Sequence, residues 1–92
     1  MTQYMVEGYV PGATEASLED GRRRIEAAAE QIAADGTSIR YLGSTFVPEE
    51  ESCFCWFESA SVVDVSRACE LAGITFARIV EAHGLMPAES AG

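Results

Sequence analysis

Hydrophobic and polar residues alternate along four segments of the chain, and this period of two predicts four β-strands. Pro11 and Gly12 follow the first of them, and an acidic turn at Pro48–Glu51 joins the second to the third. Four residues of the second strand are expected to share one face: Ile39, Tyr41, Thr45 and Val47. The predicted strands are residues 3–10, 38–47, 52–58 and 74–81.

Two further segments repeat hydrophobic residues every three or four positions, which is typical of helices with one buried face. The first helix is expected over residues 18–34, with Ser17 and Asp20 arranged like a capping box at its start. The second is expected over residues 62–72, with Ser61 as its N-cap. A glycine follows each helix, and glycine readily adopts the left-handed conformation that ends a helix.

The order β-α-β-β-α-β predicts an α+β fold, the ferredoxin-like sandwich. Its four-stranded antiparallel sheet has the strand order 4-1-3-2, and two helices cover one face. The strands hold more aromatic residues than one face can hide. We therefore expect a second subunit to cover the open face, in a homodimer of the dimeric α/β-barrel type. The domain is predicted to span residues 1–83, followed by a flexible tail over residues 84–92.

Charge and composition argue against several classes of protein. The chain of 92 residues has a formal net charge of −9, and such a surface repels the phosphates of nucleic acids. No segment resembles a signal peptide or a transmembrane helix, so we expect a cytoplasmic protein that binds neither nucleic acid nor membrane. The odd number of three cysteines argues against a disulfide framework and predicts free thiols.

Two cysteines lie two residues apart in the third predicted strand. Cys53 and Cys55 can point to the same face, where a pair of thiolates can chelate a soft or borderline metal ion. Alternatively, both are small hydrophobic residues buried in a central strand. Cys69 falls on the hydrophobic side of the second helix and is expected in the core.

The end of the last strand offers a second pair of metal ligands. Glu81 and His83 are two residues apart, so a carboxylate and an imidazole can bind one divalent ion, or both can simply be solvated. The three carboxylates of Glu49–Glu51 are expected at a solvated hairpin tip, where they can gather cations only loosely.

A carboxylate in a central strand needs an explanation, because burying an unpaired charge is costly. Glu7 lies in the middle of the first strand. One interpretation is structural: Glu7 or Glu58 pairs with Arg40 or Arg78 on a neighbouring strand. In the other, Glu7 acts as an acid or base on a bound molecule.

Four segments also match the pattern of a known family. They are Tyr4–Glu7, Asp35–Ser44, Phe54–Ser61 and Ala72–Glu81. These segments resemble a bacterial domain-of-unknown-function family, numbered four-two-four-two. The third segment resembles its run F-C-x-Y-x-A-x-S, and the fourth resembles its closing pattern G-x-P-x-x-R-I-x-E. That family includes a nickel-binding ferredoxin-like protein from actinobacteria. The resemblance covers residues 4–81 and implies a ferredoxin-like fold, a dimer and the binding of nickel or a similar divalent ion. Gly43 stands where the family often has a histidine.

No nucleotide-binding, metalloprotease, nucleophile-elbow or paired C-x-x-C motif is present, so three classes of function stay open. The first is binding of nickel or a similar divalent ion by some of five donors: Glu7, Cys53, Cys55, Glu81 and His83. The second is the binding or cofactor-free conversion of a small molecule in a cleft around Glu7, helped by Tyr41 or Tyr9. The third is a regulatory or interaction module whose acidic surface binds a basic partner.

Overall fold

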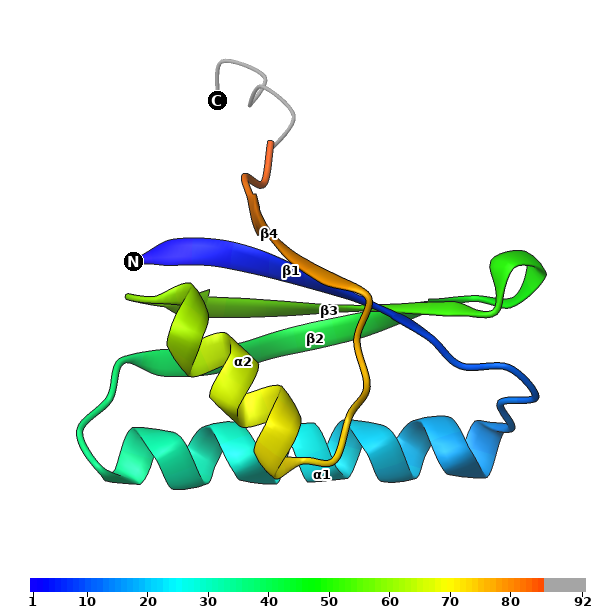
Figure 1. Ribbon diagram of the computed structural model, residues 1–92, viewed down its shortest axis with the longest axis horizontal. Coiled ribbons are helices and arrows are strands. Elements are labelled where there is room, and N and C mark those ends of the chain that lie inside the picture. The colour runs from blue at the N-terminus through cyan, green and yellow to red at the C-terminus, as the bar shows by residue number, and fades with distance from the viewer. Residues whose placement is uncertain (86–92) are drawn as a thin grey trace, which may run out of the picture.

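Four antiparallel strands form one sheet in the order β2-β3-β1-β4, which confirms the predicted order and the ferredoxin-like βαββαβ fold (Figure 1). The computed structural model describes residues 1–85. The elements are β1 (Thr2–Tyr9), α1 (Glu15–Ala34), β2 (Ile39–Val47), the short 3-10 helix η1 (Pro48–Glu50), β3 (Ser52–Ser59), α2 (Val62–Leu71) and β4 (Arg78–Ala82). The tail predicted over residues 84–92 lies, from position 86 onwards, outside the described residues.

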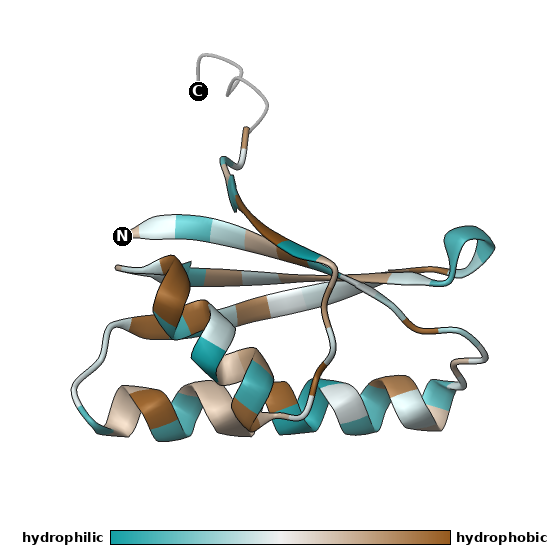
Figure 2. Ribbon diagram, viewed as in Figure 1, coloured by the Kyte–Doolittle hydropathy of each residue, from teal (hydrophilic) through white to brown (hydrophobic). Residues whose placement is uncertain are grey.

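Both helices lie on the same side of the sheet (Figure 1), and the core fills the space between them. Hydrophobic and hydrophilic residues alternate along α1 (Figure 2), as expected for a helix with one buried face. Phe57 of β3 and Val65 of α2 are fully buried. Cys69 of α2 is fully buried as well, which confirms its predicted place in the core. The buried residues of α1 are Ile25, Ala28, Ala29 and Ile32, and all of them lie in its C-terminal half.

The opposite face of the sheet is covered by no helix within residues 1–85. The strand register places Met5 of β1 beside Trp56 of β3 on this open face. Phe54 is next to Trp56 along the same face, with ring centroids 6.5 Å apart. Aromatic residues therefore lie on both faces of the sheet.

A β-bulge just before Gly43 divides β2 into two halves, so that the residues predicted to share a face do not all lie on one face of the sheet. The extra residue moves every later side chain to the other face, because side chains alternate along a strand. Ser44 and Phe46 consequently face the helices, whereas Thr45 and Val47 face away, contrary to prediction. Gly43 has a φ of 143°, a conformation that favours glycine.

Helix α1 begins three residues earlier than predicted, because Thr14 rather than Ser17 is its N-cap. The Ser17 amide donates a hydrogen bond to Thr14 Oγ1 at 3.1 Å, and the Thr14 amide donates to Ser17 Oγ at 2.8 Å. Ser17 thus belongs to a capping box, but as its third helical residue. The predicted N-cap of α2, Ser61, is confirmed by its bond from the Val63 amide at 3.1 Å.

Strand β4 begins at Arg78, four residues later than predicted. Residues 74–77 instead carry the chain from the end of α2 back to the sheet (Figure 1). The Thr75 carbonyl oxygen lies 3.1 Å from the position that a Cβ of Gly8 would occupy. The connecting segment therefore passes close to β1 at a residue that has no side chain. Within residues 1–85, no helix is long and apolar enough to cross a membrane.

Candidate functional site

A cavity of about 1120 Å³ lies between the N-terminal half of α1 and the sheet. We call it the α1 cavity. Its apolar wall includes Val6, Val10, Leu18, Ile25, Phe46 and Ile74, and its polar wall includes Glu19, Arg22, Ser44, Cys53 and Cys55. Sites for small organic molecules commonly span roughly 300–1,000 Å³ and combine an apolar wall with a few polar groups. The α1 cavity has both kinds of wall, and its volume slightly exceeds the upper end of this range.

Small residues create the cavity. Gly8 of β1 and Ala13, Ala16 and Gly21 around the start of α1 all line it, and none of them has a side chain larger than a methyl group. A Cβ at Gly21 would lie 4.0 Å from the nearest side-chain atom, Cδ1 of Ile74, which is ordinary van der Waals contact, so a Cβ fits at this position of the wall. None of the residues that line the cavity belongs to α2. The cavity therefore lies beside the packed core.

Two thiols and two hydroxyls form a cluster on the sheet side of the cavity. The Ser44 hydroxyl donates a hydrogen bond to Cys55 Sγ at 3.1 Å. Tyr41 Oη and Ser44 Oγ are 2.5 Å apart. Because Ser44 gives its only hydroxyl hydrogen to Cys55, Tyr41 must donate to Ser44. Cys53 lies two residues before Cys55 on the same face of β3, and the Ser44 hydroxyl is the donor that reaches the Cys55 sulfur.

The surroundings divide the acidity of the cluster unevenly. Interaction with the neighbouring Cys53 thiol and the hydrogen bond from Ser44 lower the pKa of Cys55 to about 7, against the opposing effect of burial. Interaction with Cys55 and burial raise the pKa of Cys53. Burial raises the pKa of Tyr41, so its phenol keeps its proton. Cys55 is therefore the most acidic of these three groups, and close to pH 7 it exchanges between thiol and thiolate.

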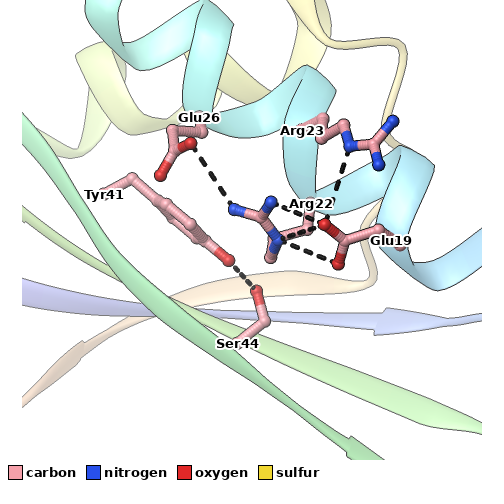
Figure 3. Close-up of polar contacts among 6 residues, drawn as sticks. All are labelled: Glu19, Arg22, Arg23, Glu26, Tyr41 and Ser44. Carbon is pink, nitrogen blue, oxygen red and sulfur yellow. Dashed lines mark hydrogen bonds and ion pairs between the residues drawn. The ribbon is translucent and has the colours of Figure 1, made fainter.

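Arg22 brings a positive charge to the helix side of the same cavity. Its side chain reaches from α1 toward Tyr41 and Ser44 (Figure 3). Arg22 Nη2 lies 2.6 Å from Glu19 Oε1, and Arg22 Nη1 lies 3.5 Å from Glu26 Oε1. The hydrogen bond from Arg22 lowers the pKa of Glu19, and that contact raises the pKa of Arg22. The pair of Arg22 and Glu19 is therefore ionised but neutral as a unit.

The rim of the cavity is tied to the hairpin between β2 and β3. The Gly12 amide donates to Glu51 Oε2 at 2.7 Å, and the Val10 amide donates to the Glu51 carbonyl oxygen at 2.7 Å. Glu51 itself adopts a left-handed φ of 51°. The prediction of a solvated hairpin tip therefore holds for Glu49 and Glu50, which are exposed, but is wrong for Glu51. Its side chain anchors the loop that closes one side of the cavity.

The α1 cavity does not surround Glu7, contrary to the cleft predicted from the sequence. Glu7 lies on the open face, where Arg78 Nε meets its carboxylate at 2.6 Å. Glu58 pairs with Arg40 at 3.1 Å on the same face. Both ion pairs confirm the structural interpretation of these carboxylates. Tyr9, the second proposed helper of Glu7, is 62% exposed at the end of β1.

The five predicted metal donors fall in three separate places. Cys53 and Cys55 line the α1 cavity, whereas Glu7 is paired on the open face. Glu81 and His83 lie together near the end of β4, with Oε2 and Nε2 2.9 Å apart. Within residues 1–85, no group of three or more His, Cys, Asp or Glu side chains can hold one metal ion. The five residues thus do not fit a single site, and metal binding stays a prediction.

Sequence reasoning missed two residues of the site and the cavity itself. The sequence pattern assigns no role to Ser44, because the bulge that turns it toward the helices leaves no clear signal apart from Gly43. Arg22 was likewise not among the predicted site residues, although it lines the cavity. A weak signal for the cavity exists over residues 13–24, where Leu18 is the only large hydrophobic residue.

Comparison with known proteins supports the fold. The chain is similar to the crystal structure of SCO4226 from Streptomyces coelicolor, an actinobacterial protein, with a TM-score of 0.73 and 20% sequence identity; the match covers 91% of this chain and 99% of that one. No model of a protein family matches the chain, and no curated protein matches it. The family resemblance in the sequence therefore stays a prediction, and what the comparison establishes is a ferredoxin-like fold shared with an actinobacterial protein.

Proposed function

We propose that the protein binds a small, largely apolar molecule in the α1 cavity. The observation that carries this proposal is the cavity itself, about 1120 Å³ next to a closely packed core. The cavity opens to solvent at its rim, where Pro11, Gly12 and Ser17 are exposed, so a molecule can enter it from outside. A space of this size, walled by side chains such as Leu18, Ile25 and Phe46, gains free energy when an apolar molecule replaces the water in it.

The charges around the cavity favour a neutral ligand with one polar atom. Glu19 already neutralises Arg22, and the chain as a whole carries a net charge of −9, so an anion is disfavoured. Glu19 and Glu26 engage all three nitrogens of the Arg22 guanidinium, but each terminal nitrogen carries a second hydrogen. A carbonyl oxygen can accept one of these hydrogens while its hydrocarbon chain lies against the apolar wall.

Filling the cavity tests this function. Isothermal titration would compare the binding of octan-3-one, a neutral ketone, to the wild type, to Gly21→Leu and to Ala27→Leu. Gly21 lines the cavity, whereas Ala27 is an exposed residue of the same helix. The leucine at position 21 should reduce affinity at least about tenfold, a loss of about 1.4 kcal/mol, and the leucine at position 27 should leave it unchanged. Absence of heat with octan-3-one and with its longer straight-chain homologues would contradict the proposal.

We also propose that a second copy of the chain covers the open face of the sheet. Met5, Phe54 and Trp56 form its apolar centre. Two ion pairs, each of an arginine and a glutamate, flank this centre. A surface that carries both positive and negative side chains beside an apolar centre can pair with its own copy across a two-fold axis.

Light scattering tests this dimer and should give a dimer mass for the wild type and a monomer mass for Trp56→Glu. The control Leu71→Glu changes an exposed residue of α2 and should stay dimeric; a monomeric wild type would refute the dimer.

The divalent ion is a separate and narrower proposal for the pair of Glu81 and His83. These two side chains lie 2.9 Å apart and offer a carboxylate and an imidazole, both of which Ni²⁺ accepts. Only two donors come from one chain, so we expect weak binding. Titration with Ni²⁺ should give binding that His83→Ala removes; equal binding by the variant would exclude this pair.

A further inference from the structure

We propose that Cys55 is a nucleophile that forms a covalent bond to a ligand in the α1 cavity, and that the ligand class is an apolar α,β-unsaturated carbonyl compound. This inference rests on the proposed function, because it assigns a chemistry to the same cavity. Three observations support it: the position of Cys55 in the cavity wall, the relay of hydrogen bonds that ends on its sulfur, and the side chains that surround the space in front of it.

The position of Cys55 separates it from the other two thiols. Cys55 lies in the central strand β3 and lines the cavity, as does Cys53. Cys69 is fully buried in α2 and does not line the cavity.

No nitrogen nucleophile competes with Cys55 in the cavity wall. The chain contains no lysine, since its six Lys or Arg residues are all arginines. The remaining nitrogen nucleophiles are His83, at the end of β4, and the N-terminal amine, and neither lines the cavity.

The hydrogen bonds around Cys55 support a thiolate and not merely a buried thiol. Ser44 donates to its sulfur at 3.1 Å, and Tyr41 donates in turn to Ser44. A hydroxyl that donates to a sulfur, and is itself held by a second donor, stabilises the negative charge of a thiolate. A buried thiol with a purely structural role needs no such relay, because it is a weak donor and a weak acceptor.

The cavity in front of the sulfur fits a soft electrophile. A thiolate reacts with polarisable carbon centres. Apolar residues beside the sulfur, such as Val6 and Phe46, are suited to pack against the hydrocarbon chain of the ligand. Arg22 reaches into the same space from α1 (Figure 3). A guanidinium is suited to stabilise the negative oxygen that develops when a thiolate adds to a conjugated carbonyl compound.

The step balances without a further reactant. The Cys55 thiolate uses an electron pair to form a bond from sulfur to the β-carbon of the ligand. The π bond between the α- and β-carbons breaks, and its electron pair moves to give an enolate. The Cys53 thiol supplies one proton to the α-carbon, so that the negative charge passes from Cys55 to Cys53. The product is a saturated thioether, and the reverse sequence releases the ligand.

Mass spectrometry of the folded protein tests the assignment. The probe is oct-1-en-3-one, and the saturated octan-3-one serves as its unreactive competitor. Peptide mapping over time should show a single adduct at Cys55, formed at least about tenfold faster than any adduct at Cys53 or Cys69. Octan-3-one should slow the reaction with a saturable dependence. Cys55→Ala should lose this adduct, and Ser44→Ala should slow it by roughly threefold to tenfold, because one donor to the thiolate is lost.

Two further comparisons make each outcome decisive. Cys53→Ala should slow the reaction but leave the adduct at Cys55; an adduct that disappears with Cys53 and persists in Cys55→Ala would overturn the assignment. Ser44→Ala should stay folded, with a melting temperature only slightly below that of the wild type, because Ser44 is exposed but bonds Tyr41 and Cys55. An unchanged rate in this variant would also count against the relay. If octan-3-one binds but oct-1-en-3-one leaves Cys55 unmodified, the nucleophile is refuted and the binding function stands. If Cys55 reacts without saturation and without competition, the nucleophile stands and the binding function is refuted.

Discussion

The two halves of helix α1 lie over the same face of the same sheet, yet one is packed and the other borders a cavity. In the C-terminal half, Ile25, Ala28 and Ile32 are buried. In the N-terminal half, Leu18 is only partly buried, and Gly21 and Ala16 line the α1 cavity.

The difference follows from the lengths of the two helices. Helix α1 has 20 residues and α2 has 10, which correspond to about 30 Å and about 15 Å at 1.5 Å per residue. The short helix can complete the core over only part of the sheet (Figure 1). Beyond its end, no second helix within residues 1–85 completes the layer, and small residues such as Ala13 and Ala16 line the space. The shortness of α2 thus leaves a cavity in one half of the two-layer sandwich.

The largest expected contrast is between two phenylalanines on the helix face of the sheet. Phe57 is fully buried in the packed half, whereas Phe46 lines the cavity and is partly exposed. Phe57→Ala should cost about 3–5 kcal/mol of unfolding free energy. Phe46→Ala should cost less than half as much, because its ring already borders open space. Urea denaturation measures both, and equal losses would show that the two halves are packed alike.

The second contrast concerns the acidity of the thiols in the two regions. Burial raises the pKa of Cys69, in the packed half, to about 12, whereas interaction with Cys53 and the hydrogen bond from Ser44 lower the pKa of Cys55 to about 7. A lowered pKa means that the thiolate of Cys55 is present above pH 7 and is lost as pH falls below it. The charged and titratable groups around Cys55 are Cys53 on β3, Tyr41 on β2, the paired Arg22 and Glu19 on α1, and Cys69 on α2.

The rate of Cys55 alkylation by oct-1-en-3-one should therefore rise with pH to a plateau, with its midpoint near pH 7. Ser44→Ala should move the midpoint upward, because it removes one donor to the thiolate. Cys69 should stay unreactive over the whole range. A midpoint at about 8.5, the value of an unperturbed cysteine, would remove the support for a stabilised thiolate.

The smallest expected effect lies at the rim of the cavity. Glu51→Ala removes the acceptor of the Gly12 amide and should cost about 0.5–1.5 kcal/mol. The amide of Gly12 should also exchange its hydrogen faster. Glu51→Gln keeps a side-chain oxygen and should retain most of the stability, and Glu49→Ala, at an exposed position, should change nothing. An equal effect of Glu49→Ala would show that charge, and not the hydrogen bond, determines the result.

The fold was predictable from the sequence because its signals are local and repeated. Alternation in the strands and the helical spacing of Ile25, Ala28 and Ile32 identify the elements, and the element order fixes the topology. The boundaries were less certain. Thr14 and Ser17 are both good N-caps, and only the paired hydrogen bonds decide between them. The bulge at Gly43 adds a single residue, which a pattern of period two cannot reveal.

The site was predicted in part, and the reason is geometric. The placement of Cys53 and Cys55 on one face follows from alternation along β3, and the pairing of Glu7 with Arg78 follows from the cost of a lone charge. The cavity depends on how far α2 reaches, a tertiary property that no local pattern encodes. Ser44 reaches Cys55 only because the bulge turns it inward.

Nuclear Overhauser effects between bound octan-3-one and the methyl groups of the protein would test the central claim most directly. The ligand should contact methyl groups of Val6, Leu18, Ile25 and Ile74, which line the α1 cavity. It should not contact Met5 or Val80, whose strand positions place them on the open face. Contacts confined to Met5 and Val80, or to the packed residues Val65 and Ile32, would contradict the assignment of the α1 cavity as the binding site.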